Sequence, residues 1–256
     1  MDVGKGNILA ERIIFKNAPI TEAIFDIRAD LPPDVTLNSL LNVYDPVKQS
    51  YPNKRERIYW HGGIQFRPDI LPELQAVEGG PDGYLFSSAD GKQTLQARKD
   101  GFTFNRFKPY ERWETFRDEG MKLWNIYASV SNPKKVTRMA LRYINRIEIP
   151  LPIRDFKDYI ATVPEIAPGI PQGLASFLMR LEIPVDEFQA VAIITESMDS
   201  REIGSVAPLI LDIDVFREGL LDVRSAEIRD IFEGLHDLKN DIFFRSVTEK
   251  ARALFD

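Results

Sequence analysis

The chain of 256 residues contains no cysteine and only two histidines, His61 and His236. The lack of cysteine excludes disulfide bonds, thiolate nucleophiles and cysteine-based zinc sites. Two histidines are too few for a histidine-rich metal site, and we expect His61 in a strand or turn and His236 on a helix surface. The sequence therefore gives no catalytic residue, no metal and no cofactor. It favours a protein that is not an enzyme, without deciding the question.

Other motifs of enzymes are missing as well. Ser129, Ser197 and Ser246 lack the G-x-S-x-G context of a hydrolase nucleophile. The glycines of Gly4-Lys5-Gly6 and His61-Gly62-Gly63 do not match the spacing of nucleotide-binding loops. We therefore exclude a P-loop and expect Gly62-Gly63 to form a bulge or tight turn.

Long apolar runs are absent, and none approaches the roughly 20 residues that cross a bilayer. The N-terminal residues MDVGKGNILAERIIFKN also lack the apolar block of a secretory signal. We therefore expect a cytoplasmic protein that does not bind membranes.

Positive charge is in deficit, since 33 lysines and arginines face 39 acidic residues, giving a net charge of −6. Nucleic-acid-binding domains are more often basic, so this balance disfavours nucleic acid as a partner. One basic and aromatic run, from Gln96 through Arg98 to Arg112, has the composition of surfaces that stack on single strands. Within it, Phe102 and Phe104 share one side of an alternating pattern, and we expect both in the core.

The clearest structural signal is the stretch VTRMALRYINRIEIP at residues 136–150. Apolar and charged residues alternate along it with the period of two that is typical of a strand with one buried face. The apolar side carries Met139, Leu141, Tyr143, Ile147 and Ile149, and the other side carries Arg138, Arg142, Arg146 and Glu148. We therefore predict a half-buried strand here.

The end of this stretch repeats an earlier one. Both contain the pattern Arg-x-acid-x-Pro, which matches Arg28 with Arg146 and Asp30 with Glu148. Both halves of the chain also share an order of predicted elements. In the first half these are a strand over 20–31, a short helix over 37–47, a strand over 55–67 broken at its glycines, a loop or helical turn over 68–81, strands over 84–88, 94–98 and 102–107, and a long helix that ends near 131. In the second half they are a strand over 136–150, a helix over 155–161, a loop over 164–173, strands over 176–183, 188–197 and 208–217, and one or two helices over 225–255.

These elements predict an α+β fold in which a strand–helix–antiparallel meander–long helix module occurs twice, at 18–132 and 136–256. Each half is similar to TATA-binding-protein-like and helix-grip folds. We expect residues 1–256 to form a single pseudo-symmetric unit, a curved antiparallel sheet with the long helices packed on one face. The pattern leaves open whether the halves share one continuous sheet or form two.

Several stretches together resemble a sporadically distributed prokaryotic family of uncharacterised proteins of about this length. The most distinctive are RYINR at 142–146 and KNDIFF at 239–244, and the resemblance runs nearly end to end. The family carries no established activity, so the resemblance implies no functional residue. Its patchy distribution suits an accessory or defence-type operon.

The candidate ligand-binding residues are four arginines and two aspartates, Arg28, Arg138, Arg142, Arg146, Asp212 and Asp214. Arginines four apart on a strand share a face, and a curved sheet could bring them together on a phosphate or carboxylate. Asp212 and Asp214 also share a face and could bind magnesium or divide acid and base roles. The alternative is that arginines and acids pair across the strands and stabilise the sheet.

Two functions follow from these alternatives. The first is a non-catalytic binding or interaction protein that acts with an unidentified protein partner; a homo-oligomer is compatible with it. The second is an enzyme or sensor that binds an anionic small molecule, a nucleotide or phosphate, on the face lined by arginine and aspartate.

Overall fold

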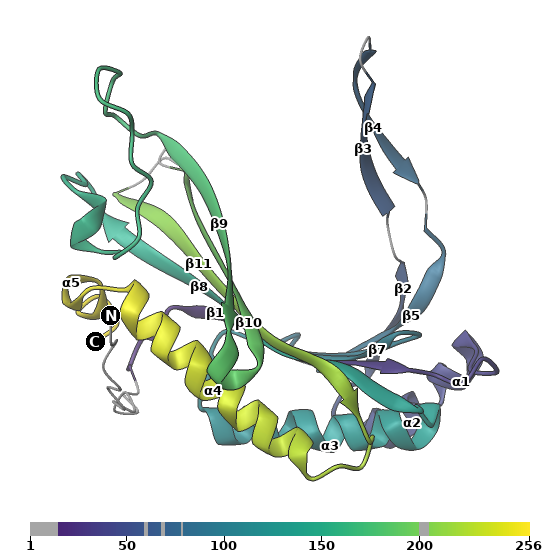
Figure 1. The fold of residues 1–256 in the computed structure, drawn as a ribbon. Helices are drawn as coiled ribbons and strands as arrows, with labels where there is room; N and C mark the ends of the chain where they lie inside the picture. The colour runs from purple at the N-terminus through teal and green to yellow at the C-terminus, as the bar shows by residue number, and fades with distance from the viewer. Residues whose placement is uncertain (1–14, 59–60, 68–69, 78, 200–204) are drawn as a thin grey trace.

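The computed structural model describes residues 15–58, 61–67, 70–77, 79–199 and 205–256. The fold is α+β, as predicted: a nine-stranded antiparallel sheet carries the long helices on one face. The sheet is curved, and the face opposite these helices is concave (Figure 1). Within the described part of the chain, no helix is long and apolar enough to cross a membrane.

The two halves of the chain meet in the middle of this sheet. Strand β1 (Ile20–Asp30) pairs with β8 (Lys135–Pro150), so that Phe25 lies opposite Leu141 and Asp26 opposite Ala140. Beyond β1 follow β7 (Gly101–Phe107), β6 (Gln93–Arg98), β5 (Pro81–Ser87) and β2 (Asn53–Ile58). Beyond β8 follow β11 (Val206–Leu221), β10 (Ala190–Asp199) and β9 (Ser176–Val185). The halves therefore share one continuous sheet, which settles the question that the sequence left open.

Helices cover the convex face. The long ones are α3 (Trp113–Ser131) and α4 (Glu227–Ser246), and the short ones are α1 (Leu37–Leu41), α2 (Tyr44–Val47) and α5 (Glu249–Arg252). Both long helices run beneath the sheet (Figure 1). The apolar stripe of α4 packs on β8 and β11. The C-terminal region forms two helices, α4 and α5, which is one of the two alternatives that the sequence left open.

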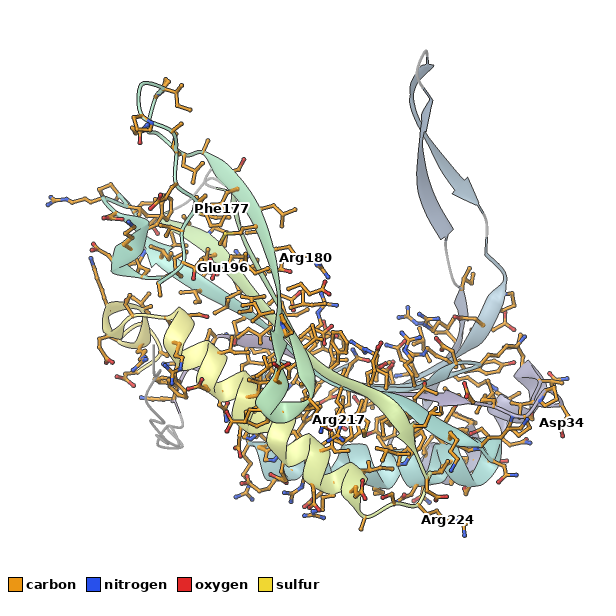
Figure 2. All side chains as sticks on the ribbon, in the orientation of Figure 1. Asp34, Phe177, Arg180, Glu196, Arg217 and Arg224 are labelled. Carbon is orange, nitrogen blue, oxygen red and sulfur yellow. The ribbon has the colours of Figure 1, made fainter. Side chains whose placement is uncertain are left out.

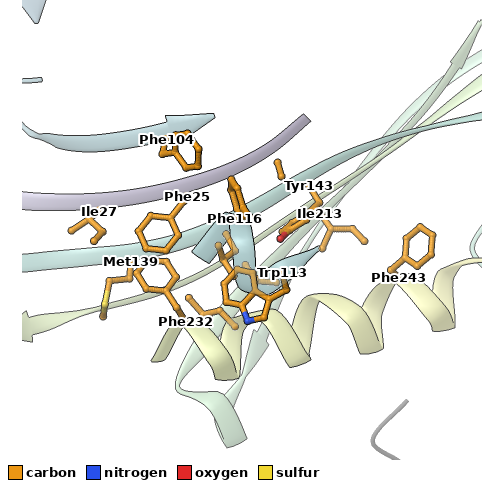
Figure 3. Packing of buried hydrophobic residues seen from close by; sticks show 14 of the residues in the cluster. Phe25, Ile27, Phe104, Trp113, Phe116, Met139, Tyr143, Ile213, Phe232 and Phe243 are labelled. Carbon is orange, nitrogen blue, oxygen red and sulfur yellow. The ribbon is translucent and has the colours of Figure 1, made fainter. Parts of the chain in front are cut away.

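Aromatic side chains bind the helices to the sheet. Phe25 of β1 stacks on Phe232 of α4 with ring centroids 3.8 Å apart and contacts Phe116 of α3 edge-on. Figure 3 shows these rings between the strands and α4. Phe102 and Phe104 are also buried in this core, as predicted. Burial of several aromatic side chains in one layer supplies much of the apolar area that stabilises such a fold.

The period of two decides which residues face the helices. On β1, Ala23, Phe25 and Ile27 are fully buried, while Arg28 on the opposite face is partly exposed. On β8, the predicted apolar residues are buried and Arg142 and Arg146 are exposed. The polar residues of these strands therefore share the concave face.

Several local predictions are wrong. Residues 70–77, predicted as a loop or helical turn, form strand β4 (Ile70–Val77), which pairs with β3 (His61–Arg67) as a two-stranded hairpin. Both strands of this separate two-stranded sheet are edge strands, where a proline such as Pro72 can be accommodated without losing a ladder bond. Gly62 and Gly63 do not break a strand, because they pair with Ala76 and Gln75 inside β3.

The predicted helices were also too long in two places. Residues 37–47 form two short helices, α1 and α2, and residues 155–161 contain only a 3-10 turn, η1 (Phe156–Asp158). A second 3-10 turn, η2 (Asp186–Phe188), joins β9 to β10. His236, predicted on a helix surface, is 6% exposed and stacks on Trp113 with ring centroids 4.3 Å apart. The packing of α4 beside α3 buries it, and this contact joins residues far apart in the sequence.

Candidate functional site

A hollow with a volume of about 500 Å³ lies near the centre of the concave face. Six strands contribute to it, because the polar residues of β1, β2, β6, β7, β8 and β11 all point to this side. Its lining consists of Ile24, Asp26, Arg28, Arg57, Gln96, Arg98, Thr103, Asn105, Arg138, Ala140, Arg142 and Asp214. Volumes of 300–1,000 Å³ are typical of small-molecule sites.

Five arginines surround the hollow: Arg28, Arg57, Arg98, Arg138 and Arg142. The side chains of Arg28 and Arg142 are substantially exposed, whereas Arg98 is buried at the floor. Guanidinium groups donate hydrogen bonds in a planar fork that matches phosphate and carboxylate. The hollow is therefore rich in donors for an anionic group.

Asp26 holds several of these arginines in place. Its carboxylate, on a residue only 7% exposed, accepts hydrogen bonds from Arg98 Nη2 at 3.0 Å and Thr103 Oγ1 at 2.7 Å. It also accepts longer contacts from Arg28 Nε at 3.3 Å and Arg138 Nη1 at 3.5 Å. The donors come from β1, β6, β7 and β8, so one carboxylate fixes the relative positions of four strands' side chains.

Arg98 shows how strongly this centre is desolvated. Its guanidinium donates to Thr103 Oγ1 at 2.6 Å, to Asp26, and through Nε to Asp100 Oδ1 at 3.0 Å. Burial lowers the pKa of Arg98 below its ordinary value, while the neighbouring Asp26 opposes that shift. Arginine remains charged under such shifts, so the floor of the hollow keeps a fixed positive charge.

Arg142 forms the most exposed wall of the hollow. Its Nε donates to Asp212 Oδ1 at 2.9 Å, and Nη2 donates to the other oxygen of Asp212. Hydrogen bonding to Asp212 raises the pKa of Arg142. Among the described residues Nη1 of Arg142 has no hydrogen-bond partner, so this guanidinium can still donate to a ligand.

Asp214 of β11 also lines the hollow, directly across the strand pair from Arg142 of β8. Its Oδ2 accepts from Arg138 Nη2 at 3.4 Å, whereas its buried Oδ1 has no hydrogen-bond partner among the described residues. Burial raises the pKa of Asp214, while Arg138 and Arg142 oppose that shift. The guanidinium of Arg138 also lies over the ring of Phe216, at 4.2 Å from its centroid, which fixes its orientation.

The predicted site residues are thus only partly brought together. Arg28, Arg138, Arg142 and Asp214 line the hollow, and Asp212 supports Arg142 from outside it. Arg146 lies further along β8, pairs with Glu148 at 2.6 Å and does not line the hollow. The predicted cross-strand pairing of arginines with acids is therefore present together with the hollow.

Sequence reasoning missed Arg57 and placed Arg98 only in the basic and aromatic run. A signal for Arg98 was available, because Gln96 and Arg98 alternate with the buried Leu95 and Ala97 on β6. Arg57 pairs with Asp82 and donates from Nε to Gln96 Oε1 at 3.1 Å. Its place beside the hollow depends on the pairing of β2 with β5 at the edge of the sheet, and no local sequence pattern predicts that pairing.

The charges of the hollow are balanced by their surroundings. The lining itself has five arginines and two aspartates, while Asp82, Asp100 and Asp212 pair with the same arginines from outside it. An anion would therefore bind through directed N–H donors more than through a large net charge. In the part of the chain that the structure describes, no group of three or more histidine, aspartate or glutamate side chains could hold a metal ion.

A second hollow of about 770 Å³ lies beside α3, against β6 and β7. Its charged groups are already paired with neighbours, Arg106 with Glu111 and Lys122 with Glu119, both at 3.1 Å. Tyr51 OH at its inner wall lies 2.7 Å from Gln93 Oε1 and 3.0 Å from Glu119 Oε1, and its one proton can be donated to either. Its basic groups are few and do not converge, so the concave-face hollow is the stronger candidate.

No protein-family model matches the chain, and no curated protein is similar to it in sequence, so its function has to be inferred from these residues themselves.

Proposed function

We propose that this protein is a non-catalytic binding protein that holds an anionic group of a small ligand, a phosphate or nucleotide, in the hollow on its concave face. The observation that carries this proposal is the convergence of five arginines from four strands on one hollow, positioned by the buried Asp26. Such an arrangement is fixed before a ligand arrives. Pre-organised donors bind better because less side-chain entropy is lost on binding.

The ion pairs leave room for a ligand. Arg142 uses Nε and Nη2 for Asp212 and keeps Nη1 available, and its side chain is 45% exposed. Arg28 stands across the same hollow with a side chain of similar exposure. An anion between them would exchange water for charge-assisted hydrogen bonds without breaking the pair beneath.

We also propose that the fold arose by duplication of one module. The strand order supports this, because counting outward from the β1–β8 pair gives β7, β6, β5 on one side and β11, β10, β9 on the other. In the sequence, a long helix follows the last strand of each half: α3 follows β7, and α4 follows β11. The predicted match of Arg28 with Arg146 adds nothing to this, since Arg28 lines the hollow and Arg146 lies outside it. Membership of the sporadically distributed prokaryotic family, a cytoplasmic location and an unidentified protein partner stay predictions.

Thermal melting against a panel of inorganic phosphate, nucleotides and divalent metals tests the proposed binding. A ligand that binds only the folded state raises the melting temperature, and at 100 times its Kd it adds about 2.7 kcal/mol. We expect a rise with phosphate or a nucleotide in the wild type and a smaller rise in Arg142→Gln. The same response in both proteins, or none in either, would contradict the proposal.

A further inference from the structure

Strand β9 is the open edge of the sheet. It pairs with β10 on one side over its whole length, from Ser176 opposite Asp199 to Val185 opposite Ala190. On the other side, no backbone hydrogen bond joins β9 to any segment that the structure describes. An edge of ten residues presents unpaired N–H and C=O groups that readily pair with another strand.

The edge strand on the opposite side of the sheet is of a different kind. There the edge strand is β2, a short strand of mostly exposed and charged residues with the sequence NKRERI. Short, charged strands are a common way to prevent edge-to-edge pairing. Strand β9 lacks this protection, since it has ten residues against six in β2 and exposes Leu178 and Ile183.

The residues of β9 combine apolar exposure with charges of both signs. Leu178 is 76% exposed and Ile183 is 42% exposed. Arg180 and Glu182 lie on the concave side of the strand, pair with each other at 3.3 Å and are both more than half exposed. Figure 2 shows Arg180 extending from β9 over the concave side.

We propose that β9 pairs in antiparallel orientation with β9 of a second copy of this chain, about a two-fold axis at Leu181. In this register Arg180 lies opposite Glu182 of the second copy, and Glu182 lies opposite its Arg180. Met179 then lies opposite Ile183 of the second copy on the helix side, and the two Leu181 side chains face each other. Opposite charges and apolar pairs directly across an antiparallel ladder stabilise it.

The self-complementary order of charges is what selects a second copy as the occupant. A two-fold axis perpendicular to the sheet keeps the concave faces of both copies on the same side, and it pairs residues of the same face. A shift of the register by two residues would place Arg180 opposite Arg180 or Glu182 opposite Glu182. Pro184 removes only one N–H donor, near the end of the strand, so it leaves most of the edge able to pair.

Sedimentation velocity over a range of concentrations tests this inference with four proteins: the wild type, Arg180→Glu, Glu182→Arg, and the double variant with both changes. Both residues are exposed, and circular dichroism checks that each variant is folded. We expect a dimer in the wild type and a Kd raised about tenfold or more in each single variant, because both cross-strand pairs become repulsive. The double variant restores opposite charges at both pairs and should return to a Kd near the wild-type value.

Amide hydrogen exchange supplies a second measurement, since dimerisation should slow exchange in residues 177–183 as the protein concentration rises. A wild type that stays monomeric at every concentration overturns the inference. A dimer that is equally stable in all four proteins also overturns it, because another surface must then form the contact. The inference does not depend on the proposed anion site, whose Arg142→Gln variant should dimerise like the wild type.

Discussion

Asp26 of β1 and Arg98 of β6 are 72 residues apart in the sequence, yet their side chains meet at 3.0 Å in the floor of the concave face. Both are almost completely buried, at 7% and 4% exposure. Two buried opposite charges stabilise each other, but either one alone would be strongly destabilising in such surroundings. The pair therefore links the stability of the sheet to the geometry of the hollow.

Replacing Asp26 with asparagine should destabilise the protein by about 3 kcal/mol, because it removes the buried charge partner of Arg98 and leaves only the exposed Asp100. Urea unfolding followed by circular dichroism measures this loss. The matched control is Asp100→Asn, which removes an exposed partner of the same arginine and should cost less than about 1 kcal/mol. Equal losses in the two variants would show that Asp26 is not the main partner of Arg98.

Lys239 of α4 should make stability depend on pH above neutrality. Its Nζ is buried, donates to Asn240 Oδ1 at 2.7 Å and lies 3.8 Å from the centroid of the Tyr143 ring. Burial lowers the pKa of Lys239 from 10.5 to about 7. The unfolded state therefore binds more protons between these two pH values, and the free energy of unfolding should rise with pH there, by about 1 kcal/mol per unit.

The variant Lys239→Met removes this titration. We expect chemical unfolding of the variant to show a flatter dependence on pH than the wild type between about pH 7 and 9.5. A wild-type slope that survives the substitution would mean that another group causes it.

Glu196 of β10 should produce the opposite slope in a lower pH range. It faces the helix side, is 1% exposed, and its Oε2 has no hydrogen-bond partner among the described residues. Burial raises the pKa of Glu196 from 4.5 to about 7. The folded state therefore binds more protons between these values, so the free energy of unfolding should fall as the pH rises through this range.

Glu196→Gln keeps the shape of the side chain and removes the charge. At pH 8 the variant should be more stable than the wild type, by on the order of 2 kcal/mol, and at pH 4.5 the two should be similar. Thermal unfolding at both pH values measures the difference. A glutamine variant that is less stable at pH 8 would contradict the assignment of a buried, uncompensated carboxylate.

Gly120 of α3 marks the closest approach of that helix to the sheet. A Cβ at this position would lie 3.1 Å from the ring of Phe25, which is itself enclosed by Phe102, Phe116 and Phe232. The ring has no room to move, so Gly120→Ala should destabilise the protein by about 1–2 kcal/mol despite the better helix propensity of alanine.

Gly234 of α4 is the control for this substitution. A Cβ there would make ordinary contact with Phe188 at 3.5 Å, so Gly234→Ala should stabilise the protein by about 0.5–1 kcal/mol. Opposite signs in the two variants, measured by urea unfolding, are the expected result. Stabilisation by both would show that α3 can move away from Phe25.

The alternation along residues 136–150 was enough to predict which residues of β8 face the core and which face the other side. It placed Arg138 and Arg142 on one face, because the period of two is a local property of the chain. The burial of Phe102 and Phe104 was predicted in the same way. These parts of the fold follow from neighbouring residues alone.

The centre of the site could not be predicted in this way. The contact between Asp26 and Arg98 depends on β6 lying two strands from β1, with β7 between them, and on the register of both pairings. The burial of His236 against Trp113 similarly depends on α3 lying beside α4. In β3 the two glycines suggested an interruption, and residues 68–81 were predicted as a loop or helical turn. The hairpin accommodates Pro72 because both of its strands are edges.

Isothermal titration calorimetry of a nucleotide into Arg142→Gln and Arg146→Gln tests the central claim most directly. These residues lie four apart on the same face of β8 and are similarly exposed, but only Arg142 lines the hollow. We predict that Arg146→Gln binds like the wild type and that Arg142→Gln binds about tenfold more weakly, as expected for the loss of a charged hydrogen bond. Equal affinities in the two variants, or weaker binding only in Arg146→Gln, would contradict an anion site in the hollow.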